Sequence, residues 1–270
     1  MPPIVVSLDG NIGAGKSTLL KACSSLPGVT CVQEPVGEWL KLKNEHGESL
    51  LELFYKDKRR WGYTFQNAAI LTRLKVINEA LASCETPILI TERSVRQRAP
   101  RLLYQSISIC ETNKSIEPAR HTAQVLTDRY VFAEMLKDSG DIDALEWQLY
   151  CNWFDTFAKD LPMGGIIHVT TGVGKSQTRI TSRGRDGESS IPVEYLTALD
   201  AQHWKWVEGT SLPVLRVSTE EDGSVEGCVE QIKAFTESLL SMRECEIEKA
   251  SAARKDLPPV AAPGGSPIKR

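Results

Sequence analysis

Short apolar runs and longer segments with helical periodicity alternate along most of this chain. In residues 60–82 and 144–157, large apolar side chains recur every three or four positions, as on one face of a helix. Strands that alternate with helices predict an α/β fold with a parallel sheet and right-handed crossovers. Five runs have the length and composition of buried strands: Ile4–Leu8, Val29–Val32, Ile88–Ile90, Ile166–Val169 and Val214–Val217.

Two segments break this alternation. Residues 95–124 show little periodicity and contain one aromatic residue, with five Lys or Arg against two acidic residues. From Ser251 the chain is rich in Pro, Ala and Gly, a composition typical of disorder. We expect one domain over residues 1–243 with an atypical insertion at 95–124, followed by a disordered tail over 244–270.

Composition narrows the choice of partners. The 270 residues carry a formal net charge of −3, so the chain as a whole has no attraction for nucleic acid or anionic membranes. No apolar run has membrane-spanning length. The first strand begins at residue 4, which leaves no room for a targeting peptide, and the seven scattered cysteines suit reduced thiols. We therefore expect a cytoplasmic protein, with the nucleus left open, that binds neither nucleic acid nor membrane.

The strongest motif is GNIGAGKST, which follows the first strand and opens a helix. Its pattern G-x-x-x-x-G-K-[ST] is that of a P-loop, whose backbone N–H groups and lysine bind the phosphates of a nucleotide while the hydroxyl after the lysine binds Mg²⁺. A second GKS at 174–176 has Val169 in place of the first glycine and predicts only a loop that enters a helix. The predicted nucleotide-binding residues are Gly10, Asn11, Ile12, Gly13, Ala14, Gly15, Lys16, Ser17 and Thr18.

Two further features could complete a phosphoryl-transfer site. Glu34 follows the second strand, which we expect beside the first, so its carboxylate could accept a proton from an attacking hydroxyl; a helix cap or a surface ion pair is an equal alternative. Arg179 and Arg183 share a helix face, and Arg185 follows across Gly184. These arginines could form a lid over phosphates or a solvated basic surface.

Seven segments follow one another along the chain in this order: GNIGAGKST, EPVGEW, YKDKRRWGYTFQ, ERS, DRYVFAEML, EWQLYCNWF and RITSRGRDGESSIPVEYL. Taken together, they resemble the deoxynucleoside kinase family, in particular deoxycytidine and deoxyguanosine kinases. The resemblance covers about residues 3–240 without the insertion. It implies a P-loop fold of three α/β/α layers with a five-stranded parallel sheet, an arginine-rich lid, ATP or another NTP as donor, Mg²⁺, and a homodimer.

The resemblance assigns catalytic roles. Glu34 would be the general base for the nucleoside 5′-hydroxyl, and Arg93 would hold both that base and the transferred phosphoryl group. Lys16 would act on the same phosphates, while Ser17 and Glu92 would position Mg²⁺. Because the transition state spreads negative charge, these cations matter more than covalent chemistry. The lid arginines that would close on the donor are Arg179, Arg183 and Arg185.

The resemblance also implies how a nucleoside would bind. Phe65 and Phe132 would sandwich the base, with Trp39 nearby. Gln66 would offer its amide to the base edge. Tyr55 and Glu188 would bind the sugar 3′-hydroxyl.

Base choice would rest on Arg73 and Asp128. Arg73 lies seven residues after Gln66, two turns along the same helix face. In the deoxycytidine and deoxyguanosine branch, an Arg and an Asp at these positions face the base. We therefore predict deoxyguanosine, deoxyadenosine or deoxycytidine over thymidine, without an order among the three.

Two other functions compete with this one. A nucleoside monophosphate kinase shares the fold, and a catalytically inactive nucleotide-binding protein would explain the disrupted segment after Glu92. Deleting residues 95–124 leaves ERS-VLTDRYVFAEML, the spacing of the family. The 30 inserted residues correspond to a whole number of codons. They begin with Val-Arg and end with Gln124, and the codons for these residues can match the two ends of an intron. We interpret it as a retained intron translated in frame, against the alternative of a functional loop over the site.

Overall fold

The five apolar runs form one parallel sheet in the computed structural model, which describes residues 1–93, 127–157, 163–188, 191–220 and 224–255. The strand order is β2-β3-β1-β4-β5, with the P-loop strand in the centre. The predicted α/β fold with a five-stranded parallel sheet is confirmed. The strands are β1 (Ile4–Gly10), β2 (Val29–Val32), β3 (Ile88–Glu92), β4 (Met163–Thr170) and β5 (Val214–Ser218).

One neighbour in the sheet was predicted wrongly. The second strand does not lie beside the first, because β3 separates them: β3 pairs with β1 along one edge and with β2 along the other. The apolar residues of a strand determine that it is buried but not which strand it pairs with. Residues Val29–Val32 are only half-buried, as suits an edge strand. Glu34 still follows the carboxyl end of this sheet.

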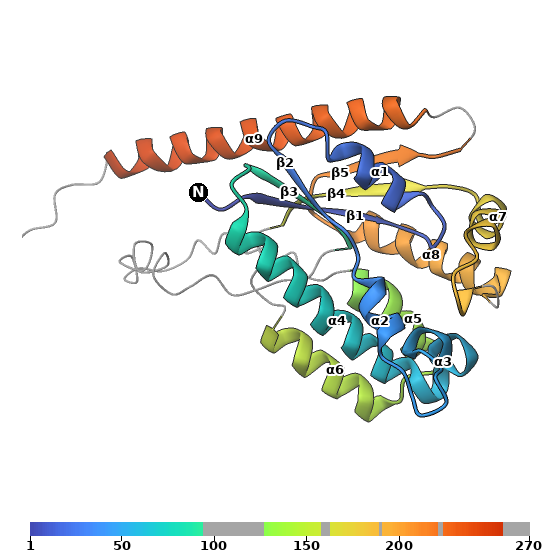
Figure 1. Ribbon diagram of the computed structural model, residues 1–270. Helices are drawn as coiled ribbons and strands as arrows, with labels where there is room; N and C mark the ends of the chain where they lie inside the picture. Colours follow the sequence, from blue (N-terminus) through green and yellow to red (C-terminus); the bar gives the residue numbers. More distant parts are fainter. Residues whose placement is uncertain (94–126, 158–162, 189–190, 221–223, 256–270) are drawn as a thin grey trace, which may run out of the picture.

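Helices cover both faces of the sheet (Figure 1). On one face, α1 (Lys16–Cys23) and α9 (Val225–Lys255) pack on alternate residues of β1, including Val6 and Leu8. On the other face lie α4 (Lys58–Ser83) and α8 (Val193–Gly209). The remaining helices are α2 (Val36–Lys41), α3 (Leu50–Lys56), the π-helical turn η1 (Asp128–Ala133), α5 (Glu134–Asp138), α6 (Ala144–Phe157) and α7 (Val173–Arg183).

Two predicted helices are confirmed, and so is the entry into a helix near the second GKS, although the GKS itself is already helical. α4 spans the expected 60–82. Asp57, which precedes it, is its N-cap, because the Asp57 carboxylate accepts the Arg60 N–H at 3.0 Å. α6 has the expected limits, and α7 begins where the second GKS was predicted to enter a helix. In the described residues, none of the helices combines the length and hydrophobicity needed to cross a bilayer.

The last described helix corrects the position of the tail. α9 continues to Lys255, so residues 244–255, which we assigned to the disordered tail, are helical. This stretch contains Ala, Glu, Lys and Arg and no Pro or Gly, so its helix propensity is high. Residues 256–270 and the insertion at 95–124 lie outside the described residues, so what we inferred for them stays a prediction.

Candidate active site

The phosphate-binding loop joins β1 to the first turn of α1. Gly15 precedes α1 with a left-handed backbone (φ 93°), which costs little only for glycine. Lys16 is buried, and its ammonium group donates to the carbonyl oxygens of Gly10 at 3.0 Å and Asn11 at 2.8 Å. Burial, together with the nearby Arg93, lowers the pKa of Lys16 to about 8, so it stays largely charged at neutral pH. A cation at a helix N-terminus suits a phosphate chain.

Ser17 and Glu92 lie together beside this loop. The Ser17 hydroxyl is 3.0 Å and 2.9 Å from the two carboxylate oxygens of Glu92, which ends β3. Mg²⁺ takes oxygen ligands, and nucleotide sites hold it with few protein groups because phosphates and water complete its shell. This hydroxyl and carboxylate therefore fit the metal-binding role predicted for them.

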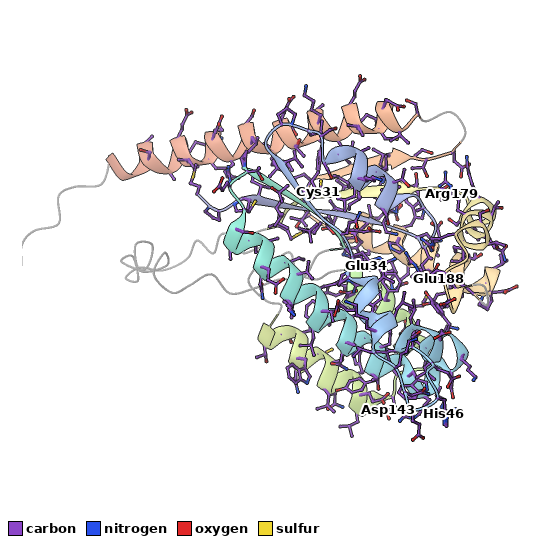
Figure 2. The ribbon with its side chains drawn as sticks, in the orientation of Figure 1. Cys31, Glu34, His46, Asp143, Arg179 and Glu188 are labelled. Carbon is purple, nitrogen blue, oxygen red and sulfur yellow. The ribbon has the colours of Figure 1, made fainter. Side chains whose placement is uncertain are left out.

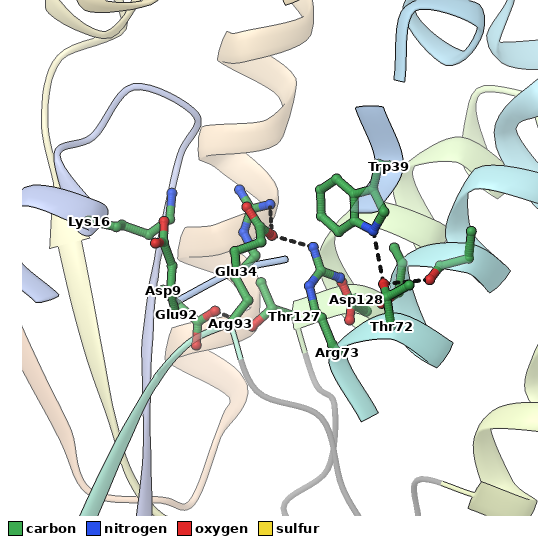
Figure 3. Close-up of polar contacts among 12 residues, drawn as sticks. Asp9, Lys16, Glu34, Trp39, Thr72, Arg73, Glu92, Arg93, Thr127 and Asp128 are labelled. Carbon is green, nitrogen blue, oxygen red and sulfur yellow. Dashed lines mark hydrogen bonds and ion pairs between the residues drawn. The ribbon is translucent and has the colours of Figure 1, made fainter. Parts of the chain in front are cut away.

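Glu34 lies in a buried network of two carboxylates and two guanidinium groups (Figure 3). Its Oε1 accepts from Nη1 of Arg93 at 3.0 Å and from Nη2 of Arg73. The other terminal nitrogen of Arg73 pairs with Asp128, so Arg73 bridges the two carboxylates. Burial by itself raises the pKa of Glu34, but Arg93, Arg73 and Lys16 outweigh it and lower the pKa to about 2. Glu34 is thus neither a helix cap nor a surface ion pair, the two alternatives that its sequence position left open.

Arg93 has an unusual backbone at the end of β3. Among the described residues it is the only non-glycine with positive φ, at 53°. Such a conformation is costly and is typically kept where a site needs it. The guanidinium lies 4.2 Å from the ring centroid of Phe132, which places it between the Glu34 carboxylate and one aromatic wall of the site.

All residues predicted to bind the nucleoside border one cavity of about 190 Å³. They come from seven parts of the chain: the segment after β2, helices α2, α3 and α4, the end of β3, the turn η1, and the segment after α7. Their roles remain predictions. These residues are Glu34, Trp39, Tyr55, Phe65, Gln66, Arg73, Arg93, Asp128, Phe132 and Glu188.

The aromatic wall formed by Phe65 and Trp39 is fixed by neighbours. Phe65 stacks on Phe54 with 4.4 Å between ring centroids and meets Trp39 edge-on at 5.2 Å. The indole N–H of Trp39 donates to the Thr72 hydroxyl at 2.9 Å. Phe54 therefore occupies one face of Phe65, and a base in the sandwich predicted with Phe132 would use the other.

Glu188 links the 190 Å³ cavity to the arginines at the end of α7. Its carboxylate pairs with Arg183 at 2.5 Å and with Arg185 at 2.8 Å. Gly184 between them ends α7 in a left-handed conformation, which lets the chain turn back. Tyr55 lies close by: its burial, followed by the proximity of Tyr195 and Glu188, raises its pKa well above the usual value, so its hydroxyl stays protonated.

A second cavity of about 540 Å³ lies on the other side of the P-loop lysine. Arg179 of α7 points to it and donates to the backbone carbonyl of Thr219 at 2.8 Å and to its hydroxyl at 3.0 Å. Figure 2 shows Arg179 and Glu188 on the α7 side of the molecule, with Glu34 nearer its middle. Both cavities border Gly13, Lys16, Ser17, Glu92, Arg183 and Arg185.

Several residues of the site escaped the sequence analysis. Phe54 and Tyr195 border the nucleoside cavity, and Thr219 borders the second one. Asp9 and Thr127 are buried beside the network and bonded to each other at 2.5 Å. Tyr195 lies within the quoted VEYL, and Asp9 directly precedes Gly10, so both had a positional signal. The single hydroxyls of Thr127 and Thr219 had none.

Comparison with known proteins agrees with this geometry. The profile of the deoxynucleoside kinase family matches residues 6–239. A fowlpox virus protein named "Probable deoxycytidine kinase FPV151" is 32% identical over 225 residues, covering 80% of this chain and 79% of its own. Mus musculus deoxycytidine kinase is 30% identical (87% and 91% covered), and Xenopus laevis mitochondrial deoxyguanosine kinase is 26% identical (80% and 82%). The chain belongs to the deoxynucleoside kinase family.

Proposed function

We propose that this kinase transfers the γ-phosphoryl group of ATP, with Mg²⁺, to the 5′-hydroxyl of a deoxynucleoside. The observation that carries the proposal is the position of Glu34. Its carboxylate lines the smaller cavity together with Lys16, Ser17 and Glu92, which also line the second cavity. An acceptor hydroxyl at that boundary would have a base on one side and the donor phosphates on the other.

The ion pairs around Glu34 indicate the role that each group would have in the reaction. Both guanidinium contacts go to Oε1 of Glu34, so Oε2 is the oxygen that can accept the proton of the attacking hydroxyl. Arg93 and Lys16 stand where the transferred phosphoryl group would carry charge. Ser17 and Glu92 would hold Mg²⁺, which would neutralise charge on the phosphate oxygens of the donor. The lid arginines would bind the donor from α7.

Charge balance supports a nucleoside rather than a nucleoside monophosphate as acceptor. The smaller cavity is lined by four carboxylates and five cationic side chains: Glu34, Glu92, Asp128 and Glu188 against Lys16, Arg73, Arg93, Arg183 and Arg185. A monophosphate acceptor would add about two negative charges, which need unpaired cations nearby. The larger excess of positive charge lies at the second cavity, which borders Lys16 and the three lid arginines against the one carboxylate of Glu92. That distribution suits a triphosphate donor and an uncharged acceptor.

The buried Asp128 supports a base with an exocyclic amine. Its Oδ1 pairs with Arg73, whereas its buried Oδ2 has no hydrogen-bond partner among the described residues. A buried unpaired acceptor is costly and would be satisfied by an amino group. Adenine, guanine and cytosine carry such a group and thymine does not. The names of the relatives, deoxycytidine and deoxyguanosine kinases, agree with this preference.

A phosphoryl-transfer screen tests the proposal. The full chain is assayed with ATP and Mg²⁺ against the four natural deoxynucleosides and against dGMP. We expect turnover of at least one amine-bearing deoxynucleoside and none of dGMP. Turnover of dGMP alone would support the monophosphate kinase instead. Binding of ATP without turnover of any acceptor would support the inactive nucleotide-binding protein.

A further inference from the structure

Two consecutive residues of β1 hold the chain on either side of segment 94–126. On the upstream side, the Arg93 N–H donates to the carbonyl oxygen of Leu8 at 3.2 Å. On the downstream side, the Thr127 hydroxyl donates to the carboxylate of Asp9 at 2.5 Å. Figure 3 shows Asp9, Arg93 and Thr127 near one another at the side of the network that adjoins Lys16. The two ends of a 33-residue connection are therefore anchored to neighbouring positions of one strand.

Asp9 is built into this place. Its side chain is fully buried and also accepts from the Ser7 hydroxyl, so both carboxylate oxygens have a donor. Burial raises the pKa of Asp9, although its hydrogen bonds and the nearby Arg93 and Lys16 oppose the increase. Burying a carboxylate costs free energy unless it is paired, so we expect Asp9 to have a structural role at this position.

A residue of the candidate site lies at each of the two anchored ends. Arg93, at the upstream end, holds the carboxylate of Glu34. Asp128, next to Thr127 at the downstream end, holds Arg73. Asp9 itself directly precedes Gly10, the first residue of the phosphate loop. One short stretch of β1 thus fixes the general-base end, the base-reading end and the phosphate loop relative to one another.

We propose that Asp9 is a positioning residue that clamps the two ends of segment 94–126 together through Thr127. The clamp aligns Arg93 with Asp128 independently of the residues that connect them. Its importance grows with the number of residues in that connection, because the entropic cost of bringing two positions of a chain together rises with the length between them. Only the activity readouts below rest on the proposed nucleoside kinase function.

The number of residues between Arg93 and Thr127 determines how much the clamp should matter. Removing Val95–Gln124 leaves Ser94, Val125 and Leu126 between the anchors, a connection of 3 residues instead of 33. The probability that chain ends meet falls with about the 3/2 power of loop length, so shortening favours closure by roughly 30-fold. In the shortened chain the covalent connection would therefore replace most of what the Asp9–Thr127 hydrogen bond does.

The experiment compares Thr127→Val in the full chain and in the chain without residues 95–124, with Thr127→Ser as the matched control. In the full chain we expect Thr127→Val to weaken nucleoside binding by roughly 10-fold or more, the effect of unpairing a buried group. ATP affinity should hold, and Thr127→Ser should restore nucleoside binding. In the shortened chain the same Val substitution should change nucleoside binding several-fold less.

Hydrogen exchange gives a readout that does not need activity. In the full chain, Thr127→Val should increase exchange at the Arg93 amide, across the clamp, as well as near Thr127. The proposal is overturned if exchange at Arg93 is unchanged, if the Val substitution is equally harmful in both chains, or if the shortened chain does not fold. If the wild-type chain phosphorylates no nucleoside but Thr127→Val still increases exchange at the Arg93 amide, the proposed function is refuted and the clamp is supported.

Discussion

Replacing Arg73 by Met removes the cation that Glu34 and Asp128 share. Met is unbranched and of similar length, so the cavity wall is retained while the two ion pairs are lost. Asp128 is then a buried carboxylate without its cation, and its pKa, already raised by burial, rises further until it binds a proton. Glu34 keeps Arg93 at 3.0 Å and Lys16 nearby, so it remains the more acidic of the two groups.

The contacts set the size of the change at Glu34. Three cations together hold its pKa at about 2 against the opposing effect of burial. Loss of one cation at ion-pair distance raises a carboxyl pKa by about 1–3 units, so we expect about 3–5 in the Arg73→Met variant. Because protonation removes the base, the acid limb of the kcat–pH profile should move to higher pH by the same amount.

Two measurements check this shift. NMR titration of protein labelled at the glutamate carboxyl carbons follows Glu34 directly, with Glu34→Gln used to assign its signal. The kcat–pH profile follows the same group during turnover. Gln66→Leu is the matched control, since it removes a polar group that lines the same cavity from the same helix face without removing a charge. The reasoning is refuted if Glu34 titrates alike in the wild type and in Arg73→Met while only the nucleoside KM rises.

Three further variants test the remaining roles. Glu34→Gln should lower kcat by roughly 10²–10⁴-fold with near-normal nucleoside and ATP affinity, measured by steady-state kinetics and calorimetry; wild-type turnover would contradict the assignment. Arg73→Met combined with Asp128→Ala should move preference toward thymidine in a four-substrate competition, and an unchanged order would show that neither residue reads the base. Glu92→Gln should raise the Mg²⁺ concentration for half-maximal activity by roughly 10–100-fold, whereas an unchanged Mg²⁺ dependence would rule out a metal role.

The sequence predicted local features well and neighbours across the sheet poorly. GNIGAGKST specifies its own backbone, so the loop and the helix after it followed from nine residues. The seven-residue spacing of Gln66 and Arg73 placed both on the inner face of α4. The contact between Arg73 and Glu34 did not follow, because it depends on β3 lying between β1 and β2. The Asp9–Thr127 bond joins residues 118 positions apart, and nothing in either residue type signals it.

A general base with a pKa of about 2 needs a physical justification. Relative to an ordinary glutamate near 4.5, the loss of basicity corresponds to about 3 kcal/mol. In a loose phosphoryl-transfer transition state, however, the acceptor hydroxyl gives up its proton late, so only part of this loss reaches the barrier. Removing one hydrogen-bond donor from a developing anion costs about 3–4 kcal/mol in the transition state. In the mechanism we propose, Arg93 would therefore contribute more by facing the transferred group than it costs by weakening Glu34. Arg73 would offset its own cost through recognition of the base.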